Sequence, residues 1–554
     1  MAVPGNCSSI PRKYVRHLNG RPLMNYAIET AKKVSDVQNI CVLTDDEEVD
    51  LIAKRLLVNS VLVHPLHSFP SGFGQYPTLD ILASFEEKRQ ERYNFVLWLS
   101  PSSPFLRNRD ILEAVFMLQR SSQDAVFSVS DEPQREWTYE QTYLPSYIEI
   151  KNVPQNEIMH RETGAFFIMN REAVADTGYI GKSATPFFLK EAHALEINSF
   201  HEWWVAEKLL NRKQILFVVA GYAEIGMGHA YRALMLAQEF HDHEIQFLCT
   251  YQSQLAYDYI SEHLYPVVMQ KQMESLEEII FRLSPDIVIN DILDTSIDYI
   301  LSLKQEDIKT INFEDQGKGS EYADLVINAL YEDAVSPNML SGYKYFCLRS
   351  EFLTTPARQA KKKVDNILVT FGGTDNTNLT MRILKILLPL SQEHNFIINI
   401  INGPGFAHKD SLKIFLSGLS ENCRERVFWS EGGTRQISEF MIESDFAITS
   451  AGRTVHELAA LKVPAIVIAA NNRERLHSFA KKAGMCFLGI QDNISDVSIK
   501  NEILSMITDY SKRIRIKDSL NNYDLTQGKK EVVGKIMDIL AMNDTKENRI
   551  ETEP

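Results

Sequence analysis

The stretch QILFVVAGYAEIGMGHAYRALMLAQEF, residues 214–240, decides the fold of the larger part of this chain. It opens with an uninterrupted apolar run over residues 215–220, which is typical of a strand buried on both faces. A loop with three glycines follows, and the apolar spacing over residues 229–240 predicts an amphipathic helix. A strand, a glycine loop and a helix in this order predict one unit of a parallel sheet covered by helices.

The same order occurs elsewhere in the chain. Residues 366–371 form another apolar run, which two glycines and a helix-like pattern over residues 379–390 follow. Before residue 212, apolar runs such as residues 95–99 alternate with helix-like stretches such as residues 107–119. We therefore expect an α/β protein built from parallel sheets wrapped by helices.

The length and these repeated patterns predict several domains. A chain of 554 residues corresponds to three or four domains at about 150 residues each. We place one domain at residues 1–212 and two similar α/β halves at residues 213–360 and 361–541. Residues 542–554 are polar and charged, which predicts a flexible tail.

Composition restricts the partners and the compartment. The net charge of −15 disfavours binding to nucleic acid or to anionic membranes. No apolar run reaches the roughly 18 residues of a membrane span, and no signal peptide is recognisable. The six cysteines lie far apart without a C-x-x-C pair, which favours reduced thiols over a zinc site or disulfide framework. We expect a cytoplasmic protein.

Three glycine loops are candidate ligand sites, at residues 221–229, 371–375 and 450–457. Ligands of open parallel sheets bind at the carboxyl ends of strands, where backbone amides and helix N-termini attract phosphate. Each loop alone is also typical of a tight turn, but together the three predict a cleft. His229 opens a predicted helix, where it could act as a base near neutral pH or simply cap the helix.

Residues 225–232, IGMGHAYR, resemble the G-x-G-H-x-x-R loop of the UDP-sugar hydrolase of pseudaminic acid biosynthesis. That enzyme resembles the peptidoglycan GlcNAc transferase of the GT-B class. Matching segments follow in the same order at residues 348–352, 371–379, 449–457 and 471–472. The resemblance implies a two-domain GT-B unit that hydrolyses UDP-2,4-diacetamido-2,4,6-trideoxy-β-L-altropyranose to UDP and free sugar without a cofactor.

The same resemblance implies roles for individual residues. His229 would activate the attacking water, and Asp291 and Asp294 are the other catalytic candidates, although either aspartate could instead cap the next helix. The tyrosine of the hydrolase's Asp-His-Tyr triplet is missing here, which leaves the identity of the sugar open. Backbone amides near Ala451 would hold the diphosphate, and Glu457 the ribose hydroxyls. The implied substrate-binding and nucleotide-binding residues are Gly226, Gly228, Arg232, Gly372, Gly373, Thr374, Ser450, Ala451, Gly452, Glu457, Asn471 and Asn472.

The first 210 residues resemble the cytidylyltransferases that activate sialic acid and related nonulosonic acids. The matching segments are residues 10–23, 44–48, 100–107 and 161–167. This resemblance implies a nucleotidyltransferase-like, GT-A-like domain of Rossmann type that transfers a cytidylyl group from CTP with Mg²⁺. The implied nucleotide site contains Arg12, Lys13, Asp45, Ser103 and Arg161, and the implied metal ligands are Glu196 and Asn198.

Two departures leave the activity of this domain open. The loop at residues 4–11 is shorter than that of the family and lacks its arginine and lysine. The segment at residues 196–198 reads Glu-Ile-Asn instead of Asp-Ile-Asp, which predicts weaker Mg²⁺ binding. The domain is therefore either an active cytidylyltransferase or a retained module for binding or dimerisation.

Together the two resemblances predict a bifunctional enzyme of nonulosonic acid biosynthesis. Its partners would be a UDP-sugar and, if the first domain is active, CTP and a nonulosonic acid, with Mg²⁺. We expect a homo-oligomer formed through the first domain. The alternative is a UDP-sugar-dependent glycosyltransferase with a non-catalytic N-terminal module, because the same cleft can pass a sugar to an acceptor instead of water.

Overall fold

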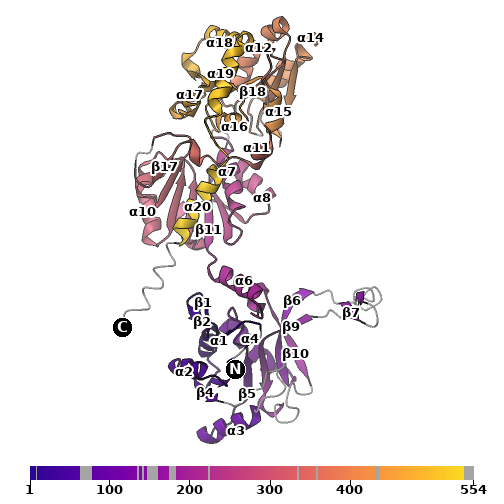
Figure 1. Ribbon diagram of the computed structural model, residues 1–554, viewed down its shortest axis with the longest axis vertical. Helices are drawn as coiled ribbons and strands as arrows, with labels where there is room; N and C mark the ends of the chain where they lie inside the picture. Colours follow the sequence, from indigo (N-terminus) through magenta and orange to yellow (C-terminus); the bar gives the residue numbers. More distant parts are fainter. Residues whose placement is uncertain are drawn as a thin grey trace. The chain divides into compact units, whose positions relative to one another are not determined.

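The computed structural model divides the chain into two compact units, residues 1–212 (unit 1) and 213–554 (unit 2; Figure 1). It describes residues 1–5, 7, 9–62, 78–133, 137–139, 143–145, 160–173, 183–222, 225–333, 336–356, 360–403, 405–430 and 436–541. The predicted tail at residues 542–554 lies outside the described residues. Within the described part, no helix is both long and apolar enough to cross a membrane. The six cysteines are free thiols.

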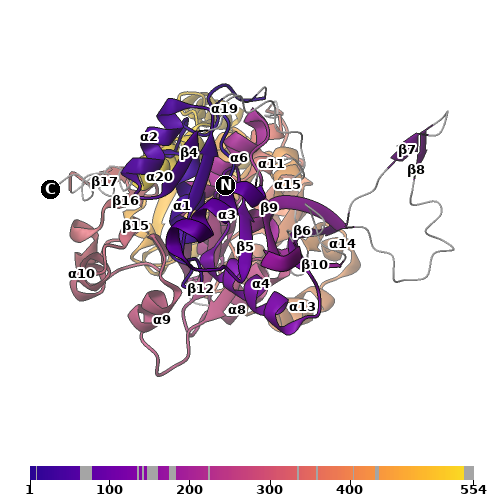
Figure 2. The same cartoon turned by 90° about the horizontal axis from the view of Figure 1, so that it is seen from below.

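Unit 1 contains the four-stranded sheet β10-β6-β9-β5 and the parallel pair β3-β4. Helices α1 (Leu23–Lys32) and α4 (Asn108–Arg120) lie beside the four-stranded sheet (Figure 2) and share one buried cluster with it. The strands are β3 (Cys41–Thr44), β4 (Asn59–Leu62), β5 (Phe95–Leu99), β6 (Ala125–Pro133), β9 (His160–Asn170) and β10 (Ala184–Leu189).

The prediction of a parallel sheet is wrong for part of unit 1. Strand β10 is parallel to β6, but β9 runs antiparallel to both β5 and β6. Between β6 and β9 the chain forms the antiparallel pair β7 (Trp137–Tyr139) and β8 (Tyr143–Pro145). Parallel neighbours need a crossover connection, whereas antiparallel neighbours do not, and the elements described between β6 and β9 are the two strands of this antiparallel pair.

The first half of unit 2 is built on a fully parallel sheet in the order β13-β12-β11-β14-β15-β16-β17. The apolar run of the sequence forms β11, in which every residue after Gln214 is buried. The strand order reverses beside β11, between β11 and β14, and such a switch point is where open sheets bind ligands. The strands are β11 (Gln214–Val219), β12 (Glu244–Cys249), β13 (Val267–Met269), β14 (Ile287–Asp291), β15 (Lys309–Phe313), β16 (Leu325–Asn328) and β17 (Met339–Ser341).

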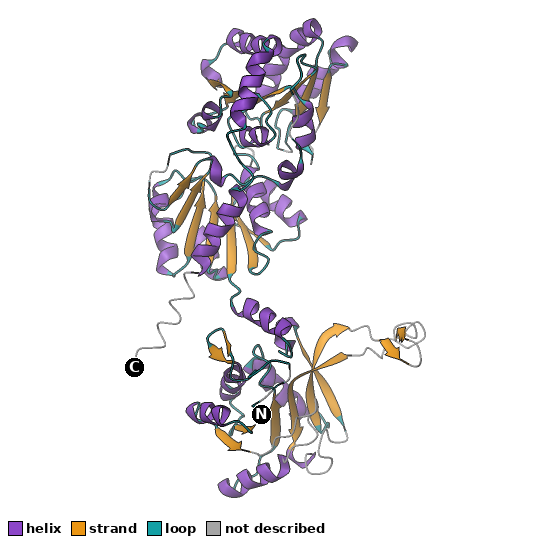
Figure 3. Ribbon diagram, in the orientation of Figure 1, coloured by secondary structure: helices purple, strands orange, loops and turns teal. Residues whose placement is uncertain are grey.

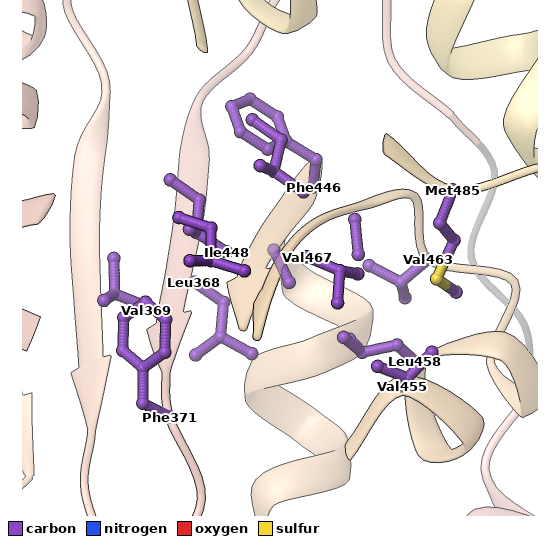
Figure 4. Packing of buried hydrophobic residues seen from close by; sticks show 14 of the residues in the cluster. Leu368, Val369, Phe371, Phe446, Ile448, Val455, Leu458, Val463, Val467 and Met485 are labelled. Atoms are coloured by element: carbon purple, nitrogen blue, oxygen red, sulfur yellow. The ribbon is translucent and has the colours of Figure 1, made fainter. Parts of the chain in front are cut away.

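The second half repeats this design with the parallel order β20-β19-β18-β21-β22-β23, and helices flank its sheet (Figure 3). Leu368, Ile448 and Val467, from three neighbouring strands, pack together with Val455 and Leu458 of α16 (Thr454–Ala460; Figure 4). The strands are β18 (Asn366–Thr370), β19 (Ile397–Ile401), β20 (Val427–Ser430), β21 (Phe446–Thr449), β22 (Ala465–Ala469) and β23 (Cys486–Ile490).

The last helix, α20 (Gly528–Ala541), does not belong to the second half as predicted. Its residues Val532, Ile536 and Leu540 are buried in the cluster that contains β11 of the first half. These residues recur every four positions, so they form one apolar stripe along the helix. The predicted domain limits of 361–541 are therefore wrong at their end, because the chain returns to cover the first sheet.

His456 of α16 packs between two phenylalanine rings in the core of the second half. Its ring centroid lies 4.2 Å from that of Phe346 and 4.2 Å from that of Phe479, with nearly parallel planes. Neither ring nitrogen has a hydrogen-bond partner among the described residues. Burial keeps the pKa of His456 well below its ordinary value of 6.5, so the ring is neutral.

We expect His456→Phe to raise the free energy of unfolding by about 1–2 kcal/mol, because a phenyl ring keeps the stack and removes two unpaired polar atoms. Urea denaturation measures the change. The matched control is His477→Phe, which should destabilise the protein because His477 Nδ1 forms a 2.7 Å hydrogen bond with the Ala451 carbonyl. A loss of stability in His456→Phe would show that the imidazole nitrogens have a partner.

Candidate active site

The three predicted glycine loops meet in unit 2. A Cβ atom at Gly373 would lie 3.4 Å from the Met227 nitrogen, so the loop after β18 touches the loop after β11. A Cβ atom at Gly228 would lie 3.0 Å from Cδ of Arg453, which belongs to the loop after β21. All three loops follow strands at the switch points of the two parallel sheets, where ligands of such folds bind.

Two glycines of these loops, Gly226 and Gly372, have φ angles of 80° and 77°, a conformation that favours glycine. The neighbouring Thr374 is buried, and its Oγ1 lies 4.0 Å from the position of a Cβ at Gly226. The predicted ligand loops thus have the tight backbone that close approach to a ligand requires.

The loop after β18 also contacts Gly403, which follows β19. A Cβ atom at Gly403 would lie 2.4 Å from the Gly373 Cα and 2.6 Å from the Gly373 carbonyl oxygen. We expect Gly403→Ala to displace the Gly373 loop and to cost about 1–3 kcal/mol of unfolding free energy in thermal denaturation. Gly534→Ala is the control, because nothing lies within 4 Å of its Cβ position in α20 and alanine favours helix. Equal stability of the two variants would contradict this close packing.

His229 and Asp291 form the chemical centre of the site. His229 is the second residue of α7 (Gly228–Ala237), and Asp291 is the last residue of β14. The distance from His229 Nδ1 to Asp291 Oδ1 is 2.5 Å. Arg232 follows one helical turn after His229 and donates to the same carboxylate, from Nε to Oδ2 at 2.7 Å and from Nη2 to Oδ1 at 2.6 Å.

Arg232 is buried between two carboxylates. Its Nη1 donates to Glu314 Oε1 at 2.9 Å, and its guanidinium lies over the ring of Phe313, 4.7 Å from the ring centre. Arg232 was predicted to bind substrate, but its side chain is 3 % exposed and its donors serve Asp291 and Glu314. The structure thus makes Arg232 the group that holds Asp291 in place. Glu314 was not among the predicted site residues, although an acidic residue directly after a buried strand was a usable signal.

The charge of Asp291 sets the roles of the two His229 nitrogens. Burial alone would raise the pKa of Asp291, but Arg232 and His229 lower it to about 2. An ionised carboxylate only accepts hydrogen bonds, so His229 Nδ1 must carry the hydrogen and donate it. When the ring is neutral, Nε2 is therefore the nitrogen with a free lone pair.

Asp294 lies outside this arrangement. Its Oδ1 accepts from Arg473 Nη1 of the second half at 2.9 Å and from the Gln316 backbone nitrogen at 3.0 Å. Its side chain is half exposed. The two aspartates that were predicted together therefore have different surroundings, and only Asp291 contacts His229 among the described interactions.

Several groups predicted to bind the nucleotide instead form hydrogen bonds with other groups of the protein. The Ala451 nitrogen donates to Glu474 Oε2 at 3.2 Å, which corrects the expectation that this amide is open to a diphosphate. Asn471 Oδ1 accepts from the Glu474 nitrogen at 2.9 Å, so this oxygen caps its own turn. Glu457 Oε1 accepts from Arg349 Nη2 at 3.1 Å. The remaining predicted groups are Ser450 and Gly452, in the loop beside Glu474, and the exposed Asn472.

Arg453 is a cation of this site that the sequence analysis did not single out. Its Nη2 donates to the Cys347 carbonyl at 2.9 Å and its guanidinium lies 4.5 Å from the centre of the Phe346 ring. Its Nη1 is buried without a hydrogen-bond partner among the described residues. Burial and the nearby Arg232 lower the pKa of Arg453 to about 10, so the side chain is charged at neutral pH. Its signal was its place directly after Gly452.

The predicted nucleotide residues of unit 1 are only partly available. Arg12 forms ion pairs with Asp46 and Glu48. Asp45 Oδ1 accepts from the Gly5 nitrogen at 2.7 Å, so Asp45 holds the N-terminal loop. Lys13 and Ser103 are buried, the Ser103 hydroxyl without a hydrogen-bond partner among the described residues, and Arg161 is exposed.

The predicted metal ligands of unit 1 are bound to protein groups. Glu196 Oε1 accepts from the Ser100 hydroxyl at 3.2 Å, and Glu196 Oε2 accepts from Asn198 Nδ2 at 3.1 Å. Among the described residues, no group of three or more His, Cys, Asp and Glu side chains is arranged to hold a metal ion. The two predicted ligands thus contact each other, with the Asn198 amide donating to the Glu196 carboxylate.

A nucleotidyltransferase-like α/β unit followed by a GT-B unit of two Rossmann-type halves defines the class of this chain. The chain belongs to the cytidylyltransferase family, whose sequence profile matches residues 6–309. The match covers most of unit 1 and continues into unit 2.

Three relatives illustrate the two similarities. An uncharacterized protein of Methanocaldococcus jannaschii is 31 % identical over 280 residues, which are 47 % of this chain and 57 % of that protein. The UDP-2,4-diacetamido-2,4,6-trideoxy-β-L-altropyranose hydrolase of Campylobacter jejuni is 28 % identical over 284 residues, 49 % of this chain and 97 % of the hydrolase. N-acylneuraminate cytidylyltransferase A of Danio rerio is 25 % identical over 216 residues, 38 % of this chain and 49 % of that enzyme.

The chain thus spans little more than half the length of the Methanocaldococcus protein and about half that of the Danio enzyme. The similarity to a UDP-sugar hydrolase and to a sialic acid cytidylyltransferase confirms both resemblances predicted from the sequence.

Proposed function

We propose that unit 2 hydrolyses a UDP-linked diacetamido-trideoxyhexose to UDP and the free sugar, in the biosynthesis of a nonulosonic acid. The observation that carries this proposal is the 2.5 Å contact between His229 and Asp291 at the point where three glycine loops meet. A histidine oriented by an ionised carboxylate is a suitable general base for activating water. The similarity to the Campylobacter hydrolase supplies the class of substrate.

In this proposal His229 Nε2 accepts one proton from a water molecule while the water oxygen forms a bond to the anomeric carbon. The bond between that carbon and the diphosphate oxygen breaks, and UDP leaves with the electron pair. Asp291 accepts the Nδ1 hydrogen and stabilises the imidazolium that forms. Arg232 keeps Asp291 ionised and fixes both carboxylate oxygens.

The leaving diphosphate needs positive charge and hydrogen-bond donors. Arg453 supplies a cation beside Gly228 whose Nη2 donates to a carbonyl oxygen and whose Nη1 has no hydrogen-bond partner among the described residues. The backbone at Gly373 and Thr374 supplies donors in the facing loop. This set differs from the predicted one, since Arg453 takes the place of Arg232 and of the Ala451 amide.

The direct test is ³¹P NMR of the full chain with the UDP-diacetamido-trideoxyhexose in EDTA and without an acceptor. We expect the signals of UDP to replace those of the UDP-sugar. Survival of the UDP-sugar under these conditions, followed by consumption when an acceptor sugar is added, would contradict hydrolysis and favour a glycosyltransferase.

For unit 1 we propose binding of a nucleotide or a nonulosonic acid without cytidylyl transfer. The engagement of Glu196 by Ser100 and Asn198 and the ion pairs of Arg12 support this choice. The test is pyrophosphate release from CTP, a nonulosonic acid and Mg²⁺. We expect none above the level without protein, and steady release would establish an active cytidylyltransferase.

A further inference from the structure

The turn after β22, residues 471–477, holds one peptide of the Ala451 loop from both sides; we name this turn the clasp. The Ala451 nitrogen donates to Glu474 Oε2 at 3.2 Å. On the other side, His477 Nδ1 lies 2.7 Å from the Ala451 carbonyl oxygen. Because a carbonyl oxygen only accepts, His477 Nδ1 carries the hydrogen of this bond.

Glu474 also fixes the end of a second strand. The same Oε2 atom accepts from the Ala470 nitrogen at 2.8 Å, and Ala470 directly follows β22. One carboxylate oxygen therefore joins the amides that follow β21 and β22. A Cβ atom at Gly452 would lie 3.7 Å from the other oxygen, so the carboxylate lies against the glycine loop.

The clasp reaches the first half of unit 2 through Arg473. Its Nη1 donates to Asp294 Oδ1 at 2.9 Å, and its Nη2 donates to the Glu314 carbonyl oxygen. The carboxylate of Glu314 in turn accepts from Arg232 at 2.9 Å. A continuous series of polar contacts thus connects the loop of Ala451 with the residues that hold Asp291.

The hydrogen bonds from the clasp to Ala451 are not required to form the turn at residues 471–477. The bond from the Glu474 nitrogen to Asn471 Oδ1 already closes the turn locally. Ala451 lies 23 residues before Glu474 and 26 before His477, so neither bond belongs to local turn geometry. A backbone amide and a carbonyl held from both sides keep one orientation, since breaking either bond leaves a polar group unpaired.

We propose that Glu474 and His477 are positioning residues for the loop at residues 450–453, and that Arg473 ties this loop to the first half. The loop carries Arg453, which contacts Gly228 beside His229. The clasp would thus fix the position of the loop at residues 450–453, which we expect to face the nucleotide, relative to His229 and Asp291, which activate the water. This inference rests on the proposed function in one respect, because it assumes that the loop at residues 450–453 faces the UDP-sugar.

Hydrogen exchange of the full chain, followed by mass spectrometry, tests the inference without any substrate. Glu474→Ala removes the shared acceptor, and we expect the amides of residues 450–453 to exchange about tenfold faster. Glu474→Gln keeps an oxygen that can accept from both amides, so exchange should stay within about twofold of the natural protein. Arg473→Gln should speed exchange of the same amides by about threefold to tenfold. Arg473 is partly exposed, so this variant tests the inference even if Glu474→Ala fails to fold.

Arg475→Gln is the matched control, because Arg475 lies in the same turn with an exposed side chain that forms no hydrogen bond or ion pair within the described residues. It should exchange like the natural protein. Unchanged exchange in both Glu474→Ala and Arg473→Gln would overturn the inference, and so would equal effects of Glu474→Ala and Glu474→Gln. An effect of Glu474→Ala alone would overturn the tie to the first half.

Calorimetric titration with UDP separates this inference from the proposed function. We expect Glu474→Ala to weaken UDP binding by about tenfold, with Glu474→Gln and Arg475→Gln within about twofold of the natural protein. If the natural protein does not bind UDP, the proposed function fails, while the exchange rates still decide whether the clasp positions the loop.

Discussion

His229→Ala should lower the rate constant kcat of UDP-sugar hydrolysis about a thousandfold, with little change in KM. The methyl group cannot accept the proton of the attacking water, and general base catalysis by a positioned side chain is worth about 10²–10⁴ in rate. KM should change little because the proton transfer occurs only in the transition state. Initial rates of UDP release, measured by ³¹P NMR at several UDP-sugar concentrations, give both constants.

His241→Ala provides the matched control for this experiment. His241 follows the helix that begins with Gly228, and its side chain is 82 % exposed and pairs only with Asp242 among the described contacts. We expect its kinetics to equal those of the natural protein. A His229→Ala enzyme that kept more than a tenth of the natural kcat would remove His229 from the role of base.

Arg232→Met should cost about 3–5 kcal/mol of unfolding free energy at pH 7. Methionine fills part of the space but leaves the buried carboxylates of Asp291 and Glu314 without their cation, and an uncompensated buried charge is expensive. Urea denaturation measures the loss. The control is Arg282→Met, which removes an ion pair between Glu274 and a mostly exposed arginine and should cost less than about 1 kcal/mol.

The pH dependence of this loss has a definite sign. In the natural protein the pKa of Asp291 is lowered from 3.8 to about 2, so its stabilisation is present above about pH 4 and lost as the pH falls through 2. In Arg232→Met only His229 still opposes the effect of burial on the pKa of Asp291, so we expect this carboxylate to be protonated more easily and its protonation to relieve the folded state. The gap in stability between the two proteins should therefore shrink from pH 7 to pH 5, and a constant gap would contradict a buried unpaired charge.

Local patterns predicted the elements of unit 2 well. The apolar run at residues 215–220 and the glycines after it correspond to β11 and its loop, and the pattern at residues 379–390 lies within α12 (Leu379–His394). Both patterns depend on burial and backbone conformation, which are largely determined by the residues within a short segment. The antiparallel direction of β9 and the packing of α20 depend on distant partners, so no local pattern contained them.

In the candidate site, too, local features were predictable and contacts between distant segments were not. The glycine loops and His229 stood out because they follow buried strands or open a helix, whereas Asp291, the last residue of β14, was implied only by the resemblance to the hydrolase. The partners of these residues were not predictable, because pairing of Arg232 with Glu314 or of Ala451 with Glu474 joins segments that are far apart in sequence. The resemblance to known families predicted which residues belong to the site. It did not predict which of them already form hydrogen bonds or ion pairs with other groups of the protein.

The return of α20 to the first sheet affects how the chain is synthesised. A ribosome delivers the strands of that sheet first, but the helix that covers part of it follows only after the whole second half has been synthesised. Until then, the apolar surface that later receives Val532, Ile536 and Leu540 stays uncovered and can attract chaperones. A truncation before residue 528 would leave the same surface uncovered permanently, so we expect it to destabilise the first half of unit 2.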